Sequence, residues 1–482
     1  MPHKGLREPD MFSALDLLFR DYVLESHIPG LIQGVVAGGR LVHVRGFGVR
    51  NLSSGHPVIP TTLFRIASLT KAFTALTVLR LRDEGRLMLD APAESYIPEL
   101  RRWDYPSRDS ARIRVRDLLS HTAGFVWDDP WADRQTLVPE TEFTRLLREG
   151  VLFSRAPGTA PEYSNLGYAL LGRIISNVSG QPYDLTIAQR ILEPLGMTST
   201  GFTGETAPIE DRATGYSWAD EGWHVEPPVP DGSFGAMGGL HSTAEDYAKW
   251  VAYLLSAWPP RDDEDPGPVP RASVRDLATQ GSSLPEMRQR YGRTRTTPGE
   301  QAVTYGMGMI VSIDKELGFT LSHTGGYPGF GSHVLLLPHH GIGFFAFANR
   351  TYADVAHPLW DAALALREGG HLADRVQAIS EPLSVAYHAA KAIYTQGDIS
   401  AAGDLLAVNF VMDRDAAGWK RDLARLKEQV GECVAAGPVT ATSGLSGKFL
   451  WTCTRGAITG SLSLAPTRKI CIQQLVLARK AS

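Results

Sequence analysis

Residues 68–85 read SLTKAFTALTVLRLRDEG, and this stretch predicts a helix that begins beside a reactive serine. Its apolar residues recur with a helical period at Leu69, Ala72, Phe73, Leu76 and Leu79, and Gly85 follows as a helix-ending residue. The spacing of Ser68 and Lys71 places an amine next to a hydroxyl, and the helix start favours a developing oxyanion. Ser68 is therefore a candidate nucleophile. The alternative interpretation is an N-cap serine with a solvated lysine.

A second motif, Tyr163-Ser164-Asn165, follows a Pro-Gly turn and precedes a helical pattern. In an extended segment residues two apart face the same side, so Tyr163 and Asn165 can point into one site. A phenol with a pKa of about 10 acts as a base only if cations lower that pKa, and we expect Lys71 to do so. Taken alone, Tyr-Ser-Asn is also an ordinary helix entry.

A third motif, His323-Thr324-Gly325-Gly326, ends the β-rich run that begins at residue 318. Its groups are expected at a strand edge where a substrate can pair, and the glycines permit close backbone approach. A similar string, HTAG at residues 121–124, follows the helical pattern VRDLLS and has no such strand. We interpret this second string as a helix-ending turn outside the catalytic site.

These three motifs, in this order, resemble those of class C β-lactamase-like and penicillin-binding-protein-like serine hydrolases. That family includes β-lactamases, DD-peptidases, D-aminopeptidases and esterases. Three supporting stretches are also similar: EGRLMLD at 84–90, DLLSHTAGF at 117–125 and GAMGGLHSTAEDYAKW at 235–250. The resemblance covers about residues 12–365.

The resemblance implies an acyl-enzyme mechanism. Ser68 would attack an ester or amide carbonyl, while Tyr163 and Lys71 take and return the proton and His323 faces them. The oxyanion would lie between the backbone N–H groups of Ser68 and Gly326.

The same resemblance implies a set of substrate-binding residues. Asn165 would bind an amide of the substrate, and Thr324 and Gly325 would lie along it. Asn349 and Arg350 belong to a FANRTY string that is similar to the class C ANKSY stretch, and they would face a substrate carboxylate.

One departure bears on the substrate. His323 stands where β-lactamases usually carry lysine, a replacement seen in peptidase and esterase relatives. An imidazole with a pKa of about 6.5 is mostly neutral at pH 7, so neutral esters should be preferred, and acidification should tighten the binding of anionic substrates. An esterase is the favoured activity, with a D-amino-acid peptidase, an amidase or a weak β-lactamase as alternatives. A non-hydrolytic penicillin-binding sensor is the alternative from another class.

The strand pattern predicts an α+β fold of the β-lactamase type. A hairpin at 31–49 and a meander from GMGMIVSID at 306 to IGFFAFANR at 342 should form a five-stranded antiparallel sheet. Helices at 10–26 and 352–367 would flank it. A mostly helical region would include helices at 141–149, 166–178 and 243–256, and the polar stretch 259–302 indicates an exposed insertion.

The chain changes character near residue 370, which predicts two domains. We expect a β-lactamase-like hydrolase domain at 1–368 and a small α+β accessory domain at 369–482. In the second domain, helices at 373–397 and 413–434 precede three strands. Helices followed by a curved antiparallel sheet resemble the topology of NTF2-like domains.

Composition excludes several other classes of protein. A net charge of -4 from mixed signs in 482 residues indicates neither a nucleic-acid nor a membrane partner, and no apolar run approaches a membrane span. The first residues carry no signal-peptide core, so we expect a cytoplasmic protein. The expected partner is a small-molecule ester, amide or D-amino-acid peptide. No oligomeric state is indicated.

Other catalytic signatures are missing from the sequence. No G-x-S-x-G elbow occurs, which disfavours an α/β-hydrolase. No H-E-x-x-H string occurs, and three cysteines (Cys433, Cys453 and Cys471) lie only in the last fifth of the chain. We therefore expect no metal and no cofactor.

Overall fold

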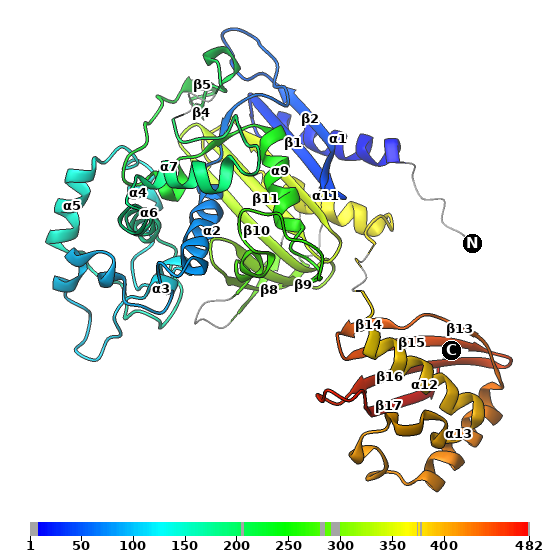
Figure 1. The fold of residues 1–482 in the computed structure, drawn as a ribbon. Helices are drawn as coiled ribbons and strands as arrows, with labels where there is room; N and C mark the ends of the chain where they lie inside the picture. Colours follow the sequence, from blue (N-terminus) through cyan, green and yellow to red (C-terminus); the bar gives the residue numbers. More distant parts are fainter. Residues whose placement is uncertain are drawn as a thin grey trace. The chain divides into compact units, whose positions relative to one another are not determined.

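The computed structural model describes residues 8–203, 207–279, 285–290, 299–373, 375 and 378–480. The chain divides into two units, Met1–Asp374 and Arg375–Ser482. The first unit is built on an antiparallel sheet that joins the N-terminal hairpin to strands from the second half of the unit (Figure 1). Its strands, in spatial order, are β2 (Arg40–Gly48), β1 (Gly30–Ala37), β12 (Ile342–Ala348), β11 (Phe330–Leu337), β10 (Gly318–Tyr327), β9 (Ile310–Asp314), β8 (Gly299–Tyr305) and β7 (Glu286–Arg290).

Both faces of this sheet are covered by helices. Val35 and its cross-strand partner Phe344 pack toward α1 (Glu8–Glu25) and α11 (Ala356–Glu368). The neighbouring side chains on the two strands, Val36 of β1 and Phe345 of β12, point to the other face and pack toward α2 (Thr70–Asp83) and α9 (Ala244–Leu255). Because successive side chains point to opposite faces, central strands buried on both sides read as continuous apolar runs.

The fold class is confirmed, but the sheet is wider than expected. Among the described residues it has eight strands, not five: the meander contributes four (β9 to β12), and β7 and β8 are added, β7 within the stretch predicted to be an insertion and β8 beginning there. Strand β8 lies between β9 and β7 and is largely half-buried, whereas β7, at the sheet edge, is polar because most of its residues face solvent. Arg290 is an exception, since it is buried and its Nε donates to Asp314 Oδ2 at 2.7 Å.

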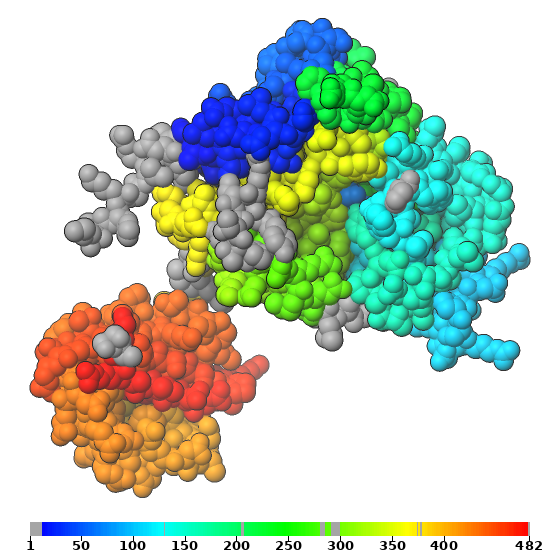
Figure 2. Space-filling model, turned by 180° about the vertical axis from the view of Figure 1, so that it is seen from behind, coloured from blue at the N-terminus to red at the C-terminus, as the bar shows by residue number. Residues whose placement is uncertain are grey.

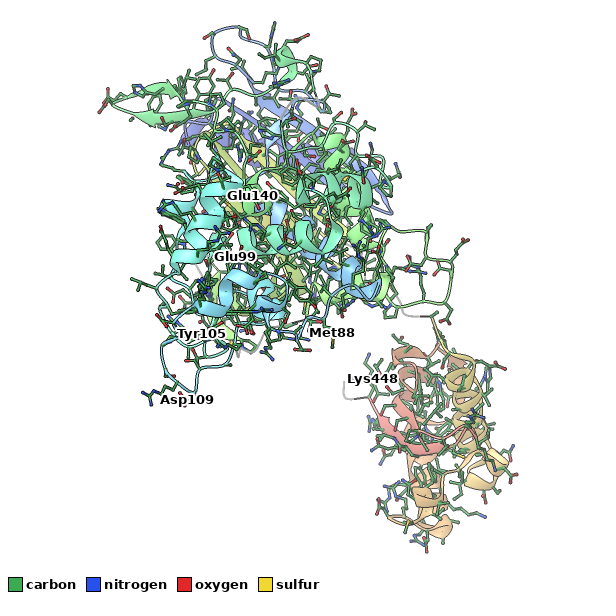
Figure 3. All side chains as sticks on the ribbon, turned by 60° about the vertical axis from the view of Figure 1, so that its left-hand side comes forward. Met88, Glu99, Tyr105, Asp109, Glu140 and Lys448 are labelled. Carbon is green, nitrogen blue, oxygen red and sulfur yellow. The ribbon has the colours of Figure 1, made fainter. Side chains whose placement is uncertain are left out.

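A mostly helical part packs beside the sheet, drawn in cyan in Figure 2 against the green and yellow segments. Its helices are α3 (Val115–Leu119), α4 (Asp129–Ala132), α5 (Glu140–Glu149), α6 (Asn165–Ser179), α7 (Tyr183–Ile187) and α8 (Gly235–Gly238). Glu140, labelled in Figure 3, begins α5 and forms an ion pair with Arg173 of α6 at 2.5 Å. Further elements are α10 (Arg271–Asp276) and the pairs β3 (Phe64–Arg65) with β6 (His241–Ser242) and β4 (Tyr216–Ala219) with β5 (Gly222–Val225).

Helix α2 is buried on nearly all sides, whereas its sequence predicted one apolar face. It packs against α6 and α8, which explains why its threonines are buried as well. Their hydroxyls have hydrogen-bond acceptors within the packed helices. Thr74 Oγ1, for example, donates to the carbonyl oxygen of Ala236 in α8 at 2.7 Å. A central helix of this kind holds the residues at its first turn in fixed positions.

The second unit has its own apolar core. Its elements are α12 (Glu381–Gln396), α13 (Ala416–Val430), β13 (Cys433–Ala436), β14 (Thr440–Ser443), β15 (Ser446–Cys453), β16 (Gly456–Leu464) and β17 (Ile472–Arg479). The strands pair antiparallel in the order β13-β15-β16-β17, with β14 also on β15, where Lys448 is labelled in Figure 3. Helix α12 begins later than expected because the Ser380 side chain caps it and Pro382 follows in its first turn.

No helix in the described ranges is both long enough and apolar enough to cross a bilayer.

Candidate active site

The predicted nucleophile lies in a short turn that leads directly into the central helix. Ser68 belongs to a 3-10 turn, Ala67–Leu69, immediately before α2. Ala67 has a φ of 48°, in the left-handed region, which is costly for a residue with a Cβ. Ser68 is 8% exposed and opens onto a cavity of about 450 Å³, the active-site cavity. Residues that line it include Ser68, Tyr163, Tyr305, His323, Thr324 and Gly326.

Lys71 is placed beside the nucleophile, as the S-x-x-K spacing predicts. Its side chain is fully buried, and Nζ donates to Ser68 Oγ at 3.1 Å, to Asn165 Oδ1 at 2.6 Å and to the carbonyl oxygen of Met237 at 2.7 Å. Burial lowers the pKa of Lys71 to about 8, although nearby carboxylates, Asp129 first among them, oppose the shift. At neutral to mildly alkaline pH a substantial fraction of this amine is neutral and can accept a proton.

An acid far away in sequence holds the second motif in place. Asp128 accepts hydrogen bonds from the backbone N–H groups of Asn165 at 2.7 Å and Leu166 at 2.9 Å, and from Ser164 Oγ at 3.1 Å. These donors lie at the free N-terminal end of α6, where a carboxylate is favourable. Asp128 therefore fixes the position of the segment Tyr163-Ser164-Asn165 at the start of α6.

Tyr163 reaches the site, but its electrostatics differ from our expectation. Its ring lines the active-site cavity together with Ser68, and Lys71 Nζ lies 4.9 Å from the centre of that ring. Burial raises the pKa of Tyr163 well above 10, and the charge of Asp129 raises it further. We expected Lys71 to lower this pKa, and that was wrong because burial of the phenol and the charge of Asp129 dominate the shift. Tyr163 is thus a neutral phenol.

Asn165 is next to the catalytic lysine and not in contact with the cavity. Each end of its side-chain amide has a partner, because Oδ1 accepts from Lys71 and Nδ2 donates to Asp129 Oδ1 at 2.5 Å. It is absent from the residues that line the active-site cavity. The expected role in substrate binding is not what this geometry provides; Asn165 orients Lys71.

The third motif lies on β10, close against the nucleophile turn. Adding a Cβ to Gly325 would bring it within 2.6 Å of the Ile66 carbonyl oxygen, so glycine permits this approach. The strand carries Thr324, Gly325 and Gly326 along the wall of the active-site cavity. Ser68 and Gly326 both line the cavity, as two oxyanion donors must.

His323 lies in the cavity wall in a neutral form. Its Nδ1 is 2.8 Å from the carbonyl oxygen of Thr324, which can only accept, so Nδ1 carries the proton. Its Nε2 then accepts from the Tyr305 hydroxyl at 2.8 Å. Burial, followed by the charge of Lys71, lowers the pKa of His323 to about 3. The expectation that mild acidification charges this histidine is therefore wrong.

Asn349 and Arg350 do not face the substrate, contrary to the sequence prediction. Asn349 is 0% exposed, and its Oδ1 accepts from the backbone N–H of Gly30 at 2.6 Å. Arg350 Nη1 donates to the carbonyl oxygen of Ser26 at 2.7 Å. Neither residue lines the active-site cavity. Asn349 ties the end of β12 to the N-terminal hairpin, and Arg350 ties it to the turn between α1 and β1.

Sequence reasoning missed several residues of the site: His121, Asp129, Asp133, Tyr305 and Tyr352. Burial and Asp129 raise the pKa of Asp133 to about 6, and Tyr352 donates to this carboxylate at 2.9 Å. The only signal for His121 was the HTAG string, which we had placed outside the site. No three His, Cys, Asp or Glu side chains in the described part of the chain are arranged to share a metal ion.

Comparisons with known proteins agree with this geometry. Protein flp of Staphylococcus aureus strain COL is 29% identical over 343 residues, which cover 70% of this chain and 63% of that protein. The chain thus spans less than two thirds of that relative's length. The D-alanyl-D-alanine-carboxypeptidase/endopeptidase AmpH of Escherichia coli K12 is 27% identical over 356 residues, covering 72% of this chain and 86% of AmpH.

Solved structures show the same fold at low sequence identity. An octameric penicillin-binding protein homologue from Pyrococcus abyssi superposes with a TM-score of 0.60 at 21% identity, covering 94% of this chain and 96% of that one. A class C beta-lactamase superposes with a TM-score of 0.59 at 18% identity, covering 76% and 98%. The profile of the Beta-lactamase family matches residues 15–368. This chain therefore belongs to the beta-lactamase family of serine hydrolases.

Proposed function

We propose that the chain is an esterase that cleaves small neutral esters through an acyl-enzyme on Ser68. The observation that carries the proposal is the contact of Lys71 Nζ with Ser68 Oγ at 3.1 Å, in a site where burial lowers the lysine pKa to about 8. A serine hydroxyl beside an amine that can be neutral near working pH is an activated nucleophile.

The chemistry follows from these positions. Ser68 Oγ forms a bond to the carbonyl carbon while its proton passes to Lys71 Nζ. The oxyanion accepts hydrogen bonds from the N–H groups of Ser68 and Gly326. The proton then returns through the neutral Tyr163 hydroxyl to the leaving-group oxygen as the carbonyl–oxygen bond breaks. Water, deprotonated by the same groups, releases the acid and restores Ser68.

The neutral third motif supports an uncharged substrate. His323 has a pKa lowered to about 3 and both of its nitrogens are engaged, so it supplies no cation to hold the carboxylate of a penicillin. A neutral acyl group needs no counter-ion, whereas an anionic β-lactam finds none in His323, and Arg288, the arginine that lines the cavity, is paired with Glu286. Short esters should therefore outcompete β-lactams at pH 7.

Labelling and turnover together test the proposal. A fluorophosphonate should modify Ser68, identified by peptide mass spectrometry, and p-nitrophenyl acetate and butyrate should be turned over steadily. Ser68→Ala should abolish both, with Ser53→Ala, an exposed serine, as the control. Stoichiometric acylation without turnover would support a penicillin-binding sensor, and a label on another residue would refute the assignment.

A D-amino-acid peptidase or amidase is the second candidate, favoured by the acidic side of the cavity. Asp129 and Asp133 both line it, and an ammonium group on the substrate would find two carboxylates there. The peptidase name of the Escherichia coli relative agrees with this candidate. A panel of short esters, D-amino-acid amides and a chromogenic cephalosporin, compared by kcat/KM, separates the two.

A further inference from the structure

The histidine of the HTAG string, His121, is part of the active-site cavity. It follows α3 and is 3% exposed, yet it lines the cavity together with Ser68 and Tyr163. Its φ of 57° lies in the left-handed region, which a residue with a long side chain adopts only when its surroundings hold it there. None of the steps described above uses this side chain.

The hydrogen bonding of His121 determines which nitrogen carries the proton. The backbone N–H of Ser164 donates to Nδ1 at 3.1 Å, so Nδ1 is an acceptor and is unprotonated. Burial and the charge of Lys71 hold the pKa of His121 well below 6.5, so the ring is neutral. Because the Nδ1 lone pair accepts this hydrogen bond, the neutral imidazole carries its proton on Nε2.

That Nε2–H group has no hydrogen-bond acceptor among the described residues, although it is buried. Buried donors are nearly always paired in folded proteins, because an unpaired one loses its bond to water. Aromatic rings hold the imidazole in place, with ring centres 4.3 Å away at Tyr163, 4.4 Å at Tyr305 and 5.2 Å at Tyr168. The imidazole is thus held in a fixed position in the wall of the active-site cavity, with one donor that is unpaired within the described part of the chain.

The other histidine of the cavity offers no such group. His323 donates from Nδ1 to the Thr324 carbonyl oxygen, and its Nε2 accepts from Tyr305. Both of its nitrogens are satisfied before a substrate arrives. Of the two imidazoles in the cavity, His121 is the one with a donor to spare.

We propose that His121 is a substrate-binding residue whose Nε2–H donates a hydrogen bond to an acceptor oxygen of the ester or amide bound at Ser68. The inference rests on the proposed acyl-enzyme chemistry, because it needs a substrate in this cavity. It reverses the sequence-based assignment of the two histidine strings: the HTAG histidine contacts substrate, and the histidine of the third motif supports the wall.

Proton NMR of the full chain with ¹⁵N-labelled histidine tests the contact directly. In the free protein the His121 ring should show the Nε2–H tautomer. After Ser68 is phosphonylated with an alkyl fluorophosphonate, which presents acceptor oxygens, the Hε2 signal should move downfield and exchange more slowly with solvent. The signal is assigned by its loss in His121→Asn.

Two variants separate substrate binding from packing. In His121→Asn the side-chain oxygen can still accept from Ser164 but nothing replaces the Nε2–H donor, so kcat/KM for a p-nitrophenyl ester should fall about tenfold, the worth of one hydrogen bond. His121→Gln places an N–H near the Nε2 position and should recover most of that loss. Melting temperatures measured alongside report any packing defect.

The outcomes are distinct. An Hε2 signal that does not move while intact mass shows Ser68 modified would overturn the role of His121 and leave the proposed function standing. Equal losses in both variants, each matched by a lower melting temperature, would likewise reduce His121 to a packing residue. Failure to modify Ser68 at all would remove the proposed function and this inference with it.

Discussion

Lys71 Nζ lies 3.1 Å from Ser68 Oγ, and the two side chains belong to successive turns of one buried segment. Asn165 Oδ1 and the Met237 carbonyl oxygen accept the other two hydrogen bonds of the amine. The lysine is therefore held with all its donors satisfied and has one neighbour that can lose a proton. The rate of catalysis should therefore depend on whether Lys71 is protonated.

The rate of acylation should rise with pH and level off above about pH 8. Burial lowers the pKa of Lys71 to that value, so below it the amine carries its proton and cannot accept another. Each pH unit on the acid side should cost about tenfold in the burst rate with p-nitrophenyl acetate. Stopped-flow measurements from pH 5.5 to 9.5 check this, and a flat profile across pH 6 to 9 would contradict it.

Lys71→Ala should lose at least about a hundredfold in kcat/KM at pH 8 and above, where the wild-type amine is neutral, and this is the usual contribution of a general base. Lys391→Ala, an exposed lysine of α12, serves as the control and should behave as wild type.

Tyr163 should act together with Lys71 and not as an independent base. Its pKa is raised by burial, so the phenol keeps its proton and can only relay one. Tyr163→Phe keeps the ring under the Lys71 ammonium but removes the hydroxyl, and should lower kcat about a hundredfold. The double variant with Lys71→Ala should lose little more than either single one, since groups that act as a unit are non-additive. Strictly multiplicative losses would show that the two residues work separately.

His323 should remain neutral throughout the working pH range. Because its pKa is lowered to about 3, it stays uncharged above roughly pH 4, and KM for an anionic cephalosporin should not fall between pH 7 and pH 5 through this residue. His323→Lys should improve that KM at pH 7.5 by up to about tenfold, or roughly 1.4 kcal/mol, by adding a cation to the cavity wall. An unchanged KM would mean that the charge at this position does not set the preference.

The catalytic motifs could be predicted because each depends on local spacing. Ser68 and Lys71 are three residues apart at a helix start, and Tyr163 enters α6 two residues before its first turn. The central strands were predictable for a similar reason, since burial on both faces leaves continuous apolar runs such as the one in β11. In these cases neighbours in sequence determine the structure.

The parts that could not be predicted depend on contacts between distant residues. Asp128 caps a helix that begins 37 residues later, and Asn349 binds the backbone at Gly30 instead of a substrate. The polar edge strand β7 carries no apolar alternation that would distinguish it from a loop. The orientation of His121 likewise depends on the backbone of Ser164. A single sequence does not indicate which distant partner each polar group has.

We propose that the C-terminal unit is an accessory domain that supplies no catalytic group. All the residues that line the active-site cavity lie before residue 374. A chain truncated after residue 374 should therefore still be labelled at Ser68 by a fluorophosphonate, at a rate within about threefold of the full chain. Circular dichroism and melting establish that the shortened chain is folded. A folded but unlabelled chain would show that the second unit completes the site.

The acidic side of the cavity should give cationic substrates an advantage that disappears in acid. Asp133 has a pKa raised to about 6 by burial and by Asp129, so it is charged above that pH and neutral below it. The α-amine of a D-alanine ester has a pKa of about 8 and remains charged from pH 5 to 7. The ratio of kcat/KM for D-alanine p-nitrophenyl ester to that for p-nitrophenyl acetate should therefore fall as the pH drops through 6. Taking the ratio cancels the titration of Lys71, which affects both substrates equally.

Asp133→Asn should make this ratio independent of pH and lower it by about tenfold at pH 7, the effect of losing one partly buried charge interaction. Tyr352 can still donate to the new amide oxygen, so the hydrogen bond at that position survives the substitution. Asp109→Asn, on the exposed loop where Figure 3 labels this residue, is the charge-matched control and should leave the ratio unchanged. If the ratio does not respond to pH in the wild type, or falls equally in both variants, then Asp133 does not contact the substrate amine. The esterase would then have no preference for cationic substrates.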